Sequence, residues 1–113
     1  MWGSWCNPCR AEAKNFAKVS KAYSGKGVQF VGINTRDTST GAALAFEKDW
    51  GITYPSLYDP TGKLLLRFKK GTLNPQAIPS TLILDREGKI AARFEGAFST
   101  GELARIVAKL KAK

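Results

Sequence analysis

Cys6 and Cys9 are the residues of this sequence best suited to chemistry, and two residues separate them in the stretch WCNPC. The chain has no other cysteine and no histidine, so a zinc site would lack the Cys and His ligands that such sites use. Covalent haem attachment needs a histidine directly after the second cysteine, where this sequence has Arg10. A structural disulfide closing so small a loop would remove little entropy from the unfolded chain. Reversible thiol–disulfide chemistry is the use that remains.

The charge of the chain is strongly basic, with 18 lysines and arginines against 9 acidic residues and a net charge of +9. An excess of this size favours anionic partners in general. The basic residues are nevertheless spread along the sequence, without interleaved aromatic residues or a nucleic-acid-binding motif. We therefore expect a solvated basic surface and no nucleic-acid partner.

Length and composition predict one globular domain. The 113 residues are 43% hydrophobic and include 11% aromatic residues, which is typical of a chain that buries a core. No apolar run approaches the roughly 18 residues that a membrane-spanning helix needs.

Periodicity predicts an alternation of helices and strands around the cysteine pair. Helical spacing follows the cysteines, β-branched and aromatic runs indicate strands, and glycines mark the ends of elements. We expect helices at 8–24, 37–51 and 99–112, strands at 28–34 and 53–59, a hairpin of strands 80–85 and 89–95, and a weakly helical stretch at 61–71.

Two motifs resemble the landmarks of the thioredoxin superfamily. WGSWCNPCRAE resembles its W-C-x-P-C signature, and AIPSTLILDREGKI resembles its cis-proline loop followed by a hairpin. Glu12 and the helix and strand between residues 40 and 62 are similar to features of the TlpA/ResA-like, redoxin-type thiol:disulfide oxidoreductases. The resemblance implies an α/β fold of three layers, a mixed sheet flanked by helices, formed by a single domain of residues 1–113.

The resemblance assigns roles to the cysteine motif. Cys6, at the amino end of a helix whose unpaired N–H groups favour a thiolate, is expected to be the exposed nucleophile. Cys9, one turn further on, is the expected buried resolving thiol. Pro8 suits the first helical turn because its missing N–H is not needed there. Asn7 is the other intervening residue, one of the pair that tunes thiolate stability in the family.

Glu12 lies one helical turn from Cys9 on the same face and is our candidate general base for the Cys9 proton. This role requires a pKa raised by partial burial. The alternative is an ordinary exposed glutamate stabilised by the helix dipole. Family members usually have a proline two residues after this glutamate, to kink the helix, where this sequence has Lys14.

Ile78 and Pro79 carry the second landmark. The resemblance implies a cis bond that brings Pro79 beside Cys6 and lets Ile78 pair with an extended substrate strand. Trp5 and residues 96–98 are expected to form an apolar rim around the disulfide. Trp2 and Trp50 are assigned to packing.

The family usually has a central strand ending just before the cysteine motif, where this chain has Met1. We therefore expect the domain to be incomplete at its amino end, with the central strand missing and flanking backbone groups left unpaired. A longer reading frame with an upstream strand would support this hypothesis, and a stop codon directly before Met1 would contradict it.

The same resemblance implies the partners and the location. It implies protein thiols and disulfides as substrates, including apocytochrome c in cytochrome c biogenesis, and an upstream thiol reductant, with no cofactor and no metal. It also implies an extracytoplasmic location, periplasmic or at the cell surface, with any membrane anchor in a segment before Met1.

Two other functions remain open. A redoxin-type peroxidase would have a single peroxidatic cysteine in a T-x-x-C setting, whereas here the C-x-x-C pair is intact. A non-catalytic binding module on a thioredoxin fold would be expected to lose a cysteine or the proline, and neither is lost. Reduction of insulin disulfides separates both alternatives from an oxidoreductase.

Overall fold

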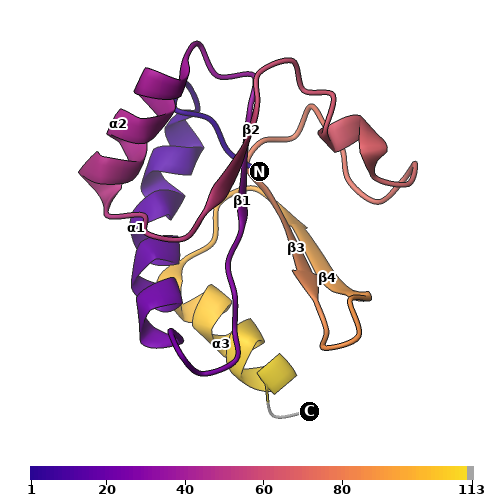
Figure 1. Cartoon of the computed structure of the whole chain (residues 1–113). Coiled ribbons are helices and arrows are strands. Elements are labelled where there is room, and N and C mark those ends of the chain that lie inside the picture. Colours follow the sequence, from indigo (N-terminus) through magenta and orange to yellow (C-terminus); the bar gives the residue numbers. More distant parts are fainter. Residues whose placement is uncertain (112–113) are drawn as a thin grey trace.

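A computed structural model describes residues 1–111 of the chain as helices on and around short strands (Figure 1). Its elements are α1 (Asn7–Ala22), β1 (Gly32–Thr35), α2 (Thr40–Trp50), β2 (Ser56–Asp59), the 3-10 helix η1 (Leu65–Arg67), β3 (Ser80–Leu84), β4 (Ile90–Glu95) and α3 (Thr100–Lys111). The three predicted helices and the hairpin are confirmed; the last residue expected in the third helix, 112, lies outside the described part. Within that part, no helix has the length and apolar character needed to cross a membrane.

The predicted helix ends follow from local capping. Cys6 is the N-cap of α1, with proline in the first turn. Ser39 caps α2, its hydroxyl accepting a hydrogen bond from the Ala42 N–H at 3.0 Å. Gly51 ends α2 in the left-handed conformation, with φ of 71°, which glycine adopts without steric cost. These local signals explain why the helices were predictable from the sequence.

The strands form two pairs. β1 and β2 are parallel, with Gly32 opposite Ser56, and β3 and β4 are antiparallel, with Ser80 opposite Glu95. The prediction of a strand over 28–34 is wrong in its first half, because residues 28–31 have no strand partner within 1–111 and β1 starts at Gly32. The stretch 61–71 contains only the short η1.

The first two residues join these strand pairs. The backbone N–H of Trp2 donates to the carbonyl of Ile33, and the Trp2 carbonyl accepts from the N–H of Thr35, both at 2.9 Å. Trp2 thereby forms a parallel bridge with Asn34. Met1 exchanges hydrogen bonds with Ser80 of β3, at 2.8 and 3.4 Å. The chain just before the cysteine motif is therefore held between β1 and β3.

Two apolar clusters form the core, and α1 contributes to both. The first contains Trp2, Cys6, Cys9, Ala13, Ala43 and Phe46. The second contains Val19, Phe98, Leu103 and Val107. In Figure 1, α2 lies beside the upper part of α1 and α3 crosses its lower part. The cysteine pair thus belongs to the cluster that α1 shares with α2.

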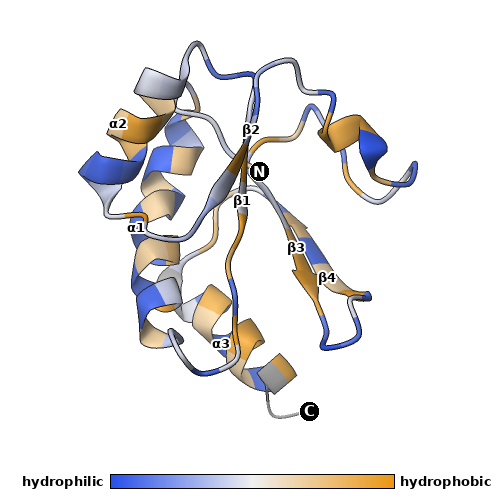
Figure 2. Cartoon of the chain, in the orientation of Figure 1, coloured by the Kyte–Doolittle hydropathy of each residue, from blue (hydrophilic) through white to orange (hydrophobic). Residues whose placement is uncertain are grey.

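An apolar groove separates the two strand pairs beyond the Met1–Trp2 junction. Residues 27–31 line one side and residues 81–86 the other, and Phe16, Leu103, Val107 and Leu110 also line it. Figure 2 shows apolar colouring on α3 and on parts of the segment before β1 and of β3. Backbone and apolar side chains that a neighbouring strand would cover are accessible here.

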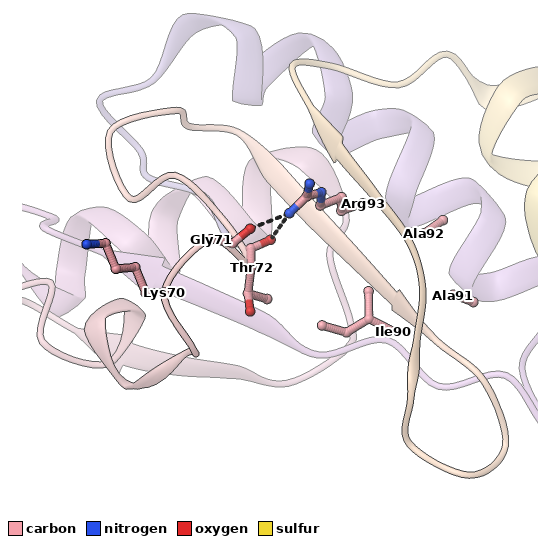
Figure 3. A pocket seen from close by; sticks show the side chains of 7 residues that line it. All are labelled: Lys70, Gly71, Thr72, Ile90, Ala91, Ala92 and Arg93. Atoms are coloured by element: carbon pink, nitrogen blue, oxygen red, sulfur yellow. Dashed lines mark hydrogen bonds between the residues drawn. The ribbon is translucent and has the colours of Figure 1, made fainter.

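Another pocket lies beside β4. Arg93 reaches from β4 to the loop that precedes β3 and donates to the carbonyls of Gly71 and Thr72 (Figure 3). This contact fastens the loop that leads to Ile78 and Pro79. None of the residues predicted for the cysteine site lines this pocket.

The open groove predicts how the 113-residue chain behaves when it is produced alone. We expect strong binding of the dye 8-anilinonaphthalene-1-sulfonate and a shallow urea transition, because the groove exposes apolar surface in the folded state. Val28→Ser, in the groove, should lower the dye fluorescence. Leu66→Ser, which removes an exposed apolar side chain that does not line the groove, should not. Equal fluorescence of the wild type and Val28→Ser would show that the dye does not bind there.

Candidate active site

The cysteine pair forms a disulfide at the amino end of α1. The two Cα atoms are 5.2 Å apart, as the close spacing requires. The backbone N–H of Cys9 donates to Cys6 Sγ at 3.2 Å, so the sulfur occupies the place of an N-cap acceptor. After reduction the same N–H and the helix dipole would stabilise a Cys6 thiolate. The geometry therefore favours ionisation at Cys6.

Burial does not distinguish the two cysteines in the oxidised chain. Cys6 is 4% exposed and Cys9 2%, so the expectation of an exposed Cys6 is wrong for this state. Both pack in the cluster that contains Trp2 and Phe46. What sets Cys6 apart is its N-cap position and its contact with the loop before β3.

That loop contains the expected cis bond. The peptide bond between Ile78 and Pro79 is cis, which confirms the prediction from the second motif. Cys6 Sγ lies 3.8 Å from the carbonyl oxygen of Ile78. Pro79 is buried, and Ile78 is half-buried against the cluster around the disulfide. Residues 72 positions apart in the sequence thus meet at the reactive sulfur.

Glu12 is buried, with 6% of its surface exposed, which excludes the alternative of an exposed glutamate. Its Oε2 accepts a hydrogen bond from the Phe98 N–H at 2.9 Å. Burial raises the pKa of Glu12 from 4.5 to about 7, against the opposing effects of this hydrogen bond and of the Met1 ammonium group. A carboxyl group with this pKa can accept and release a proton near neutral pH.

Asp37 holds the turn that leads into Cys6, and the sequence analysis missed it. Its carboxylate accepts hydrogen bonds from the N–H and hydroxyl of Ser4, at 2.8 and 2.6 Å, from Asn34 Nδ2 at 2.8 Å and from the Thr38 N–H at 2.9 Å. Burial acts to raise the pKa of Asp37, but these hydrogen bonds outweigh it and the pKa is lowered. The available signal was that Asp37 follows the predicted strand 28–34, since ligand and active sites in α/β folds lie beyond the carboxyl ends of strands.

The aromatic rim differs from the expectation. Trp5 is 45% exposed, and its indole N–H donates to the Thr35 carbonyl at 3.1 Å. Phe98, by contrast, is buried in the second cluster and contacts the site only through its N–H to Glu12. The rim therefore contains Trp5 and not Phe98. Trp2 and Trp50 pack against Phe46, as predicted.

Asn7 and Pro8 are exposed at the start of α1. Proline in the first turn confirms its predicted place. Lys14 is also exposed, and α1 continues past it to Ala22. The lysine therefore interrupts neither the helix nor the burial of Glu12.

Comparison with known proteins identifies similar chains. Residues 1–110 match the Redoxin family. The thiol-disulfide oxidoreductase ResA of Bacillus subtilis is 29% identical over 90 residues, which cover 80% of this chain and 47% of that protein. The chain spans about half the length of the curated relatives it matches.

Solved structures resemble the fold closely. A DsbF homologue from Corynebacterium diphtheriae has a TM-score of 0.86 and 38% identity, over 96% of this chain and 68% of its own. A secreted thiol-disulfide isomerase from Corynebacterium glutamicum has a TM-score of 0.89 and 30% identity, over 99% of this chain and 68% of its own. The predicted thioredoxin-like α/β fold is thereby confirmed.

The raised pKa of Glu12 predicts how stability depends on pH. Between pH 4.5 and about 7 the folded chain retains a proton that the unfolded chain releases, so stability should fall as the pH rises through this range. In Glu12→Gln the side chain stays neutral and can still accept the hydrogen bond from the Phe98 N–H. This variant should therefore lack the fall in stability and be roughly 1–3 kcal/mol more stable than the wild type at pH 8.

Urea unfolding of the oxidised chain between pH 4 and 8 measures this difference. Glu87→Gln, which alters an exposed residue of the hairpin turn, is the matched control and should follow the wild type. Parallel stability curves for the wild type and Glu12→Gln would show that Glu12 has no raised pKa.

Proposed function

This chain belongs to the Redoxin family, and on that premise we propose that it exchanges thiols and disulfides with protein substrates, as a reductase, through Cys6 and Cys9. The observation that carries the proposal is the disulfide at the start of α1, with Cys6 Sγ capped by the Cys9 N–H and facing the carbonyl before a cis proline. This arrangement supports a stabilised Cys6 thiolate, after reduction, beside a backbone that can pair with an extended substrate.

The reaction follows from the two sulfurs. In the reduced chain the Cys6 thiolate attacks a substrate disulfide, forms a mixed disulfide and releases one substrate thiolate. Cys9 then loses its proton, attacks Cys6 Sγ and releases the second substrate thiolate, which takes up a proton. Two electrons pass from the cysteine pair to the substrate, and an upstream thiol reductant restores the pair.

Glu12 is the proposed base for the Cys9 proton. It lies one helical turn after Cys9 and is buried in the same region, with a pKa raised to about 7. The Phe98 N–H fixes one carboxylate oxygen, which leaves the other to accept a proton. A base with this pKa ionises in the range where a buried thiol must be deprotonated.

Ile78, Pro79 and Trp5 are the proposed substrate-binding residues. The Ile78 carbonyl lies beside the reactive sulfur, and the exposed Trp5 offers an apolar surface next to it. A substrate segment bound there in an extended conformation would bring its disulfide to Cys6.

We propose an extracytoplasmic location and, among the substrates, apocytochrome c. Support for the location is that one close structural neighbour is described as a secreted thiol-disulfide isomerase. Support for thiol–disulfide exchange comes from the relatives named as thiol-disulfide oxidoreductases. Reduction of insulin disulfides by the full chain tests the activity. Turnover of peroxide without insulin reduction would indicate a peroxidase, and neither activity would indicate a binding module.

The assignment of nucleophile and resolving thiol predicts different trapping by the two cysteine variants. Cys6→Ser should abolish thiol–disulfide exchange, because Cys9 lacks both the N-cap position and the contact with the Ile78 carbonyl. Cys9→Ser should accumulate mixed disulfides on Cys6, because the resolving step is removed. Non-reducing electrophoresis and peptide mapping measure this, with Cys6→Ser/Cys9→Ser as the blank. Mixed disulfides found on Cys9 in Cys6→Ser would reverse the assignment.

The role of Glu12 predicts slow resolution in its absence. Glu12→Gln should release a substrate from the mixed disulfide roughly 10- to 100-fold more slowly near pH 7, a scale typical of losing a general base. The defect should fade at high pH, where Cys9 ionises unaided, and Cys6 alkylation should keep its pH dependence. Single-turnover release across pH measures this.

Glu47→Gln, a half-buried carboxylate on α2 whose pKa burial also raises, is the control and should release at the wild-type rate. Equal rates for the wild type and Glu12→Gln at every pH would exclude Glu12 as the base.

A further inference from the structure

Arg36 has an unusual backbone conformation directly after β1. Its φ is 51°, and within residues 1–111 it is the one non-glycine residue in the left-handed region. Such a conformation is unfavourable for a side chain with a Cβ and persists only where neighbouring contacts impose it. Here the Arg36 N–H donates to the Asp59 carbonyl at 2.8 Å, and Asp37, the next residue, is bound to Ser4. The turn thus sets the direction of the Arg36 side chain.

That side chain is held between Trp5 and the loop leading to the cis proline. Arg36 Cζ lies 5.6 Å from the centre of the Trp5 ring, and Nη2 donates to the Pro75 carbonyl at 3.1 Å. The aliphatic stem passes so close to Gly62 that a Cβ there would come within 3.3 Å of Arg36 Cγ. The guanidinium is therefore positioned by three separate segments and is not a freely rotating surface group.

The charge of Arg36 is not neutralised by the protein. Arg36 is exposed, and across residues 1–111 no carboxylate lies within ion-pair distance of it. The nearest acidic residue in the sequence, Asp37, is buried and occupied by four hydrogen bonds. Among the described residues, Pro75 is the one hydrogen-bond acceptor of the guanidinium. The remaining donors can bind a carboxylate from another molecule.

We infer that Arg36 is a specificity residue that favours substrate segments with an acidic side chain close to the reacting cysteine. The inference rests on the proposed function, because it requires a substrate to bind along Ile78 and Trp5. Trp5 precedes Cys6 and contacts the guanidinium, and Pro75 lies three residues before Ile78, so a segment bound along Ile78 and Trp5 would lie within reach of Arg36. Arg10, which is also exposed, donates to the Ser4 carbonyl at 3.4 Å and adds positive charge next to the cysteine motif.

Peptide disulfides that differ in one side chain test this inference. Each probe carries a cysteine in a mixed disulfide with a chromogenic thiol, and Glu, Gln or Lys at a neighbouring position. With the reduced full chain, kcat/KM should follow the order Glu, Gln, Lys, with about a three- to tenfold difference between Glu and Lys at low ionic strength. The difference should lie mainly in KM and shrink at 0.5 M salt, because the charges are exposed to solvent.

Variants separate the charge of Arg36 from general effects. Arg36→Gln should abolish the Glu, Gln, Lys order of kcat/KM. Its rate of reduction of the Gln peptide should stay within about twofold of the wild-type rate. Arg36→Lys should keep part of the order, since it keeps the charge but loses the guanidinium contact with the Trp5 ring. Arg105→Gln changes the net charge equally from an exposed position on α3 and should leave the order intact.

The outcomes are distinct. The same charge order in Arg36→Gln as in the wild type, or no order in the wild type, would overturn the inference while leaving the proposed function standing. No reduction of any peptide by the wild type would contradict the proposed function and the inference with it. If Arg36→Gln does not fold, two other measurements decide. An unchanged order of kcat/KM in Arg36→Lys, or an order in the wild type that 0.5 M salt does not weaken, would overturn the inference.

Discussion

The buried carboxylate of Asp37 fixes the chain immediately before the disulfide. It lies just after β1, and its two hydrogen bonds to Ser4 reach back 33 positions along the sequence. The neighbouring backbone adds to this connection, because Thr35 accepts from the Trp5 indole and pairs with Trp2. Cys6 follows this fastened turn directly, so its position relative to Ile78 depends on contacts made by residues that carry no sulfur chemistry themselves.

The two buried carboxyl groups, Asp37 and Glu12, have pKa values shifted in opposite directions, and the number of hydrogen-bond donors around each explains the difference. Asp37 accepts four hydrogen bonds from N–H and O–H groups, which stabilise the charged form more than burial destabilises it. Glu12 accepts one hydrogen bond among the described residues, from the Phe98 N–H, so the effect of burial prevails and the pKa of Glu12 is raised. A carboxylate kept ionised serves to hold structure, whereas one that titrates near neutral pH can move protons.

Sequence patterns predicted what depends on local signals and missed what depends on long-range contacts. The helices carry their own caps at Cys6 and Ser39, and the cis bond at Pro79 belongs to a motif, so these were predictable. Residues 28–31 have strand composition but no pairing partner, which composition alone does not reveal. Asp37 had only the general signal of following a predicted strand, and Arg36 had none. Their contacts with Ser4 and Trp5 are made only in the fold.

The titration of Glu12 also depends on parts of the fold remote from the cysteines. Its hydrogen-bond donor, Phe98, packs with Val19, Leu103 and Val107 in the second cluster. Leu103 and Val107 also line the groove between the strand pairs. Any change that loosens or fills this groove acts on the packing of Phe98, and through its N–H on the balance between burial and hydrogen bonding at Glu12. Because α1 contributes to both clusters, we expect the pKa of Glu12 to depend on how tightly the second cluster is packed.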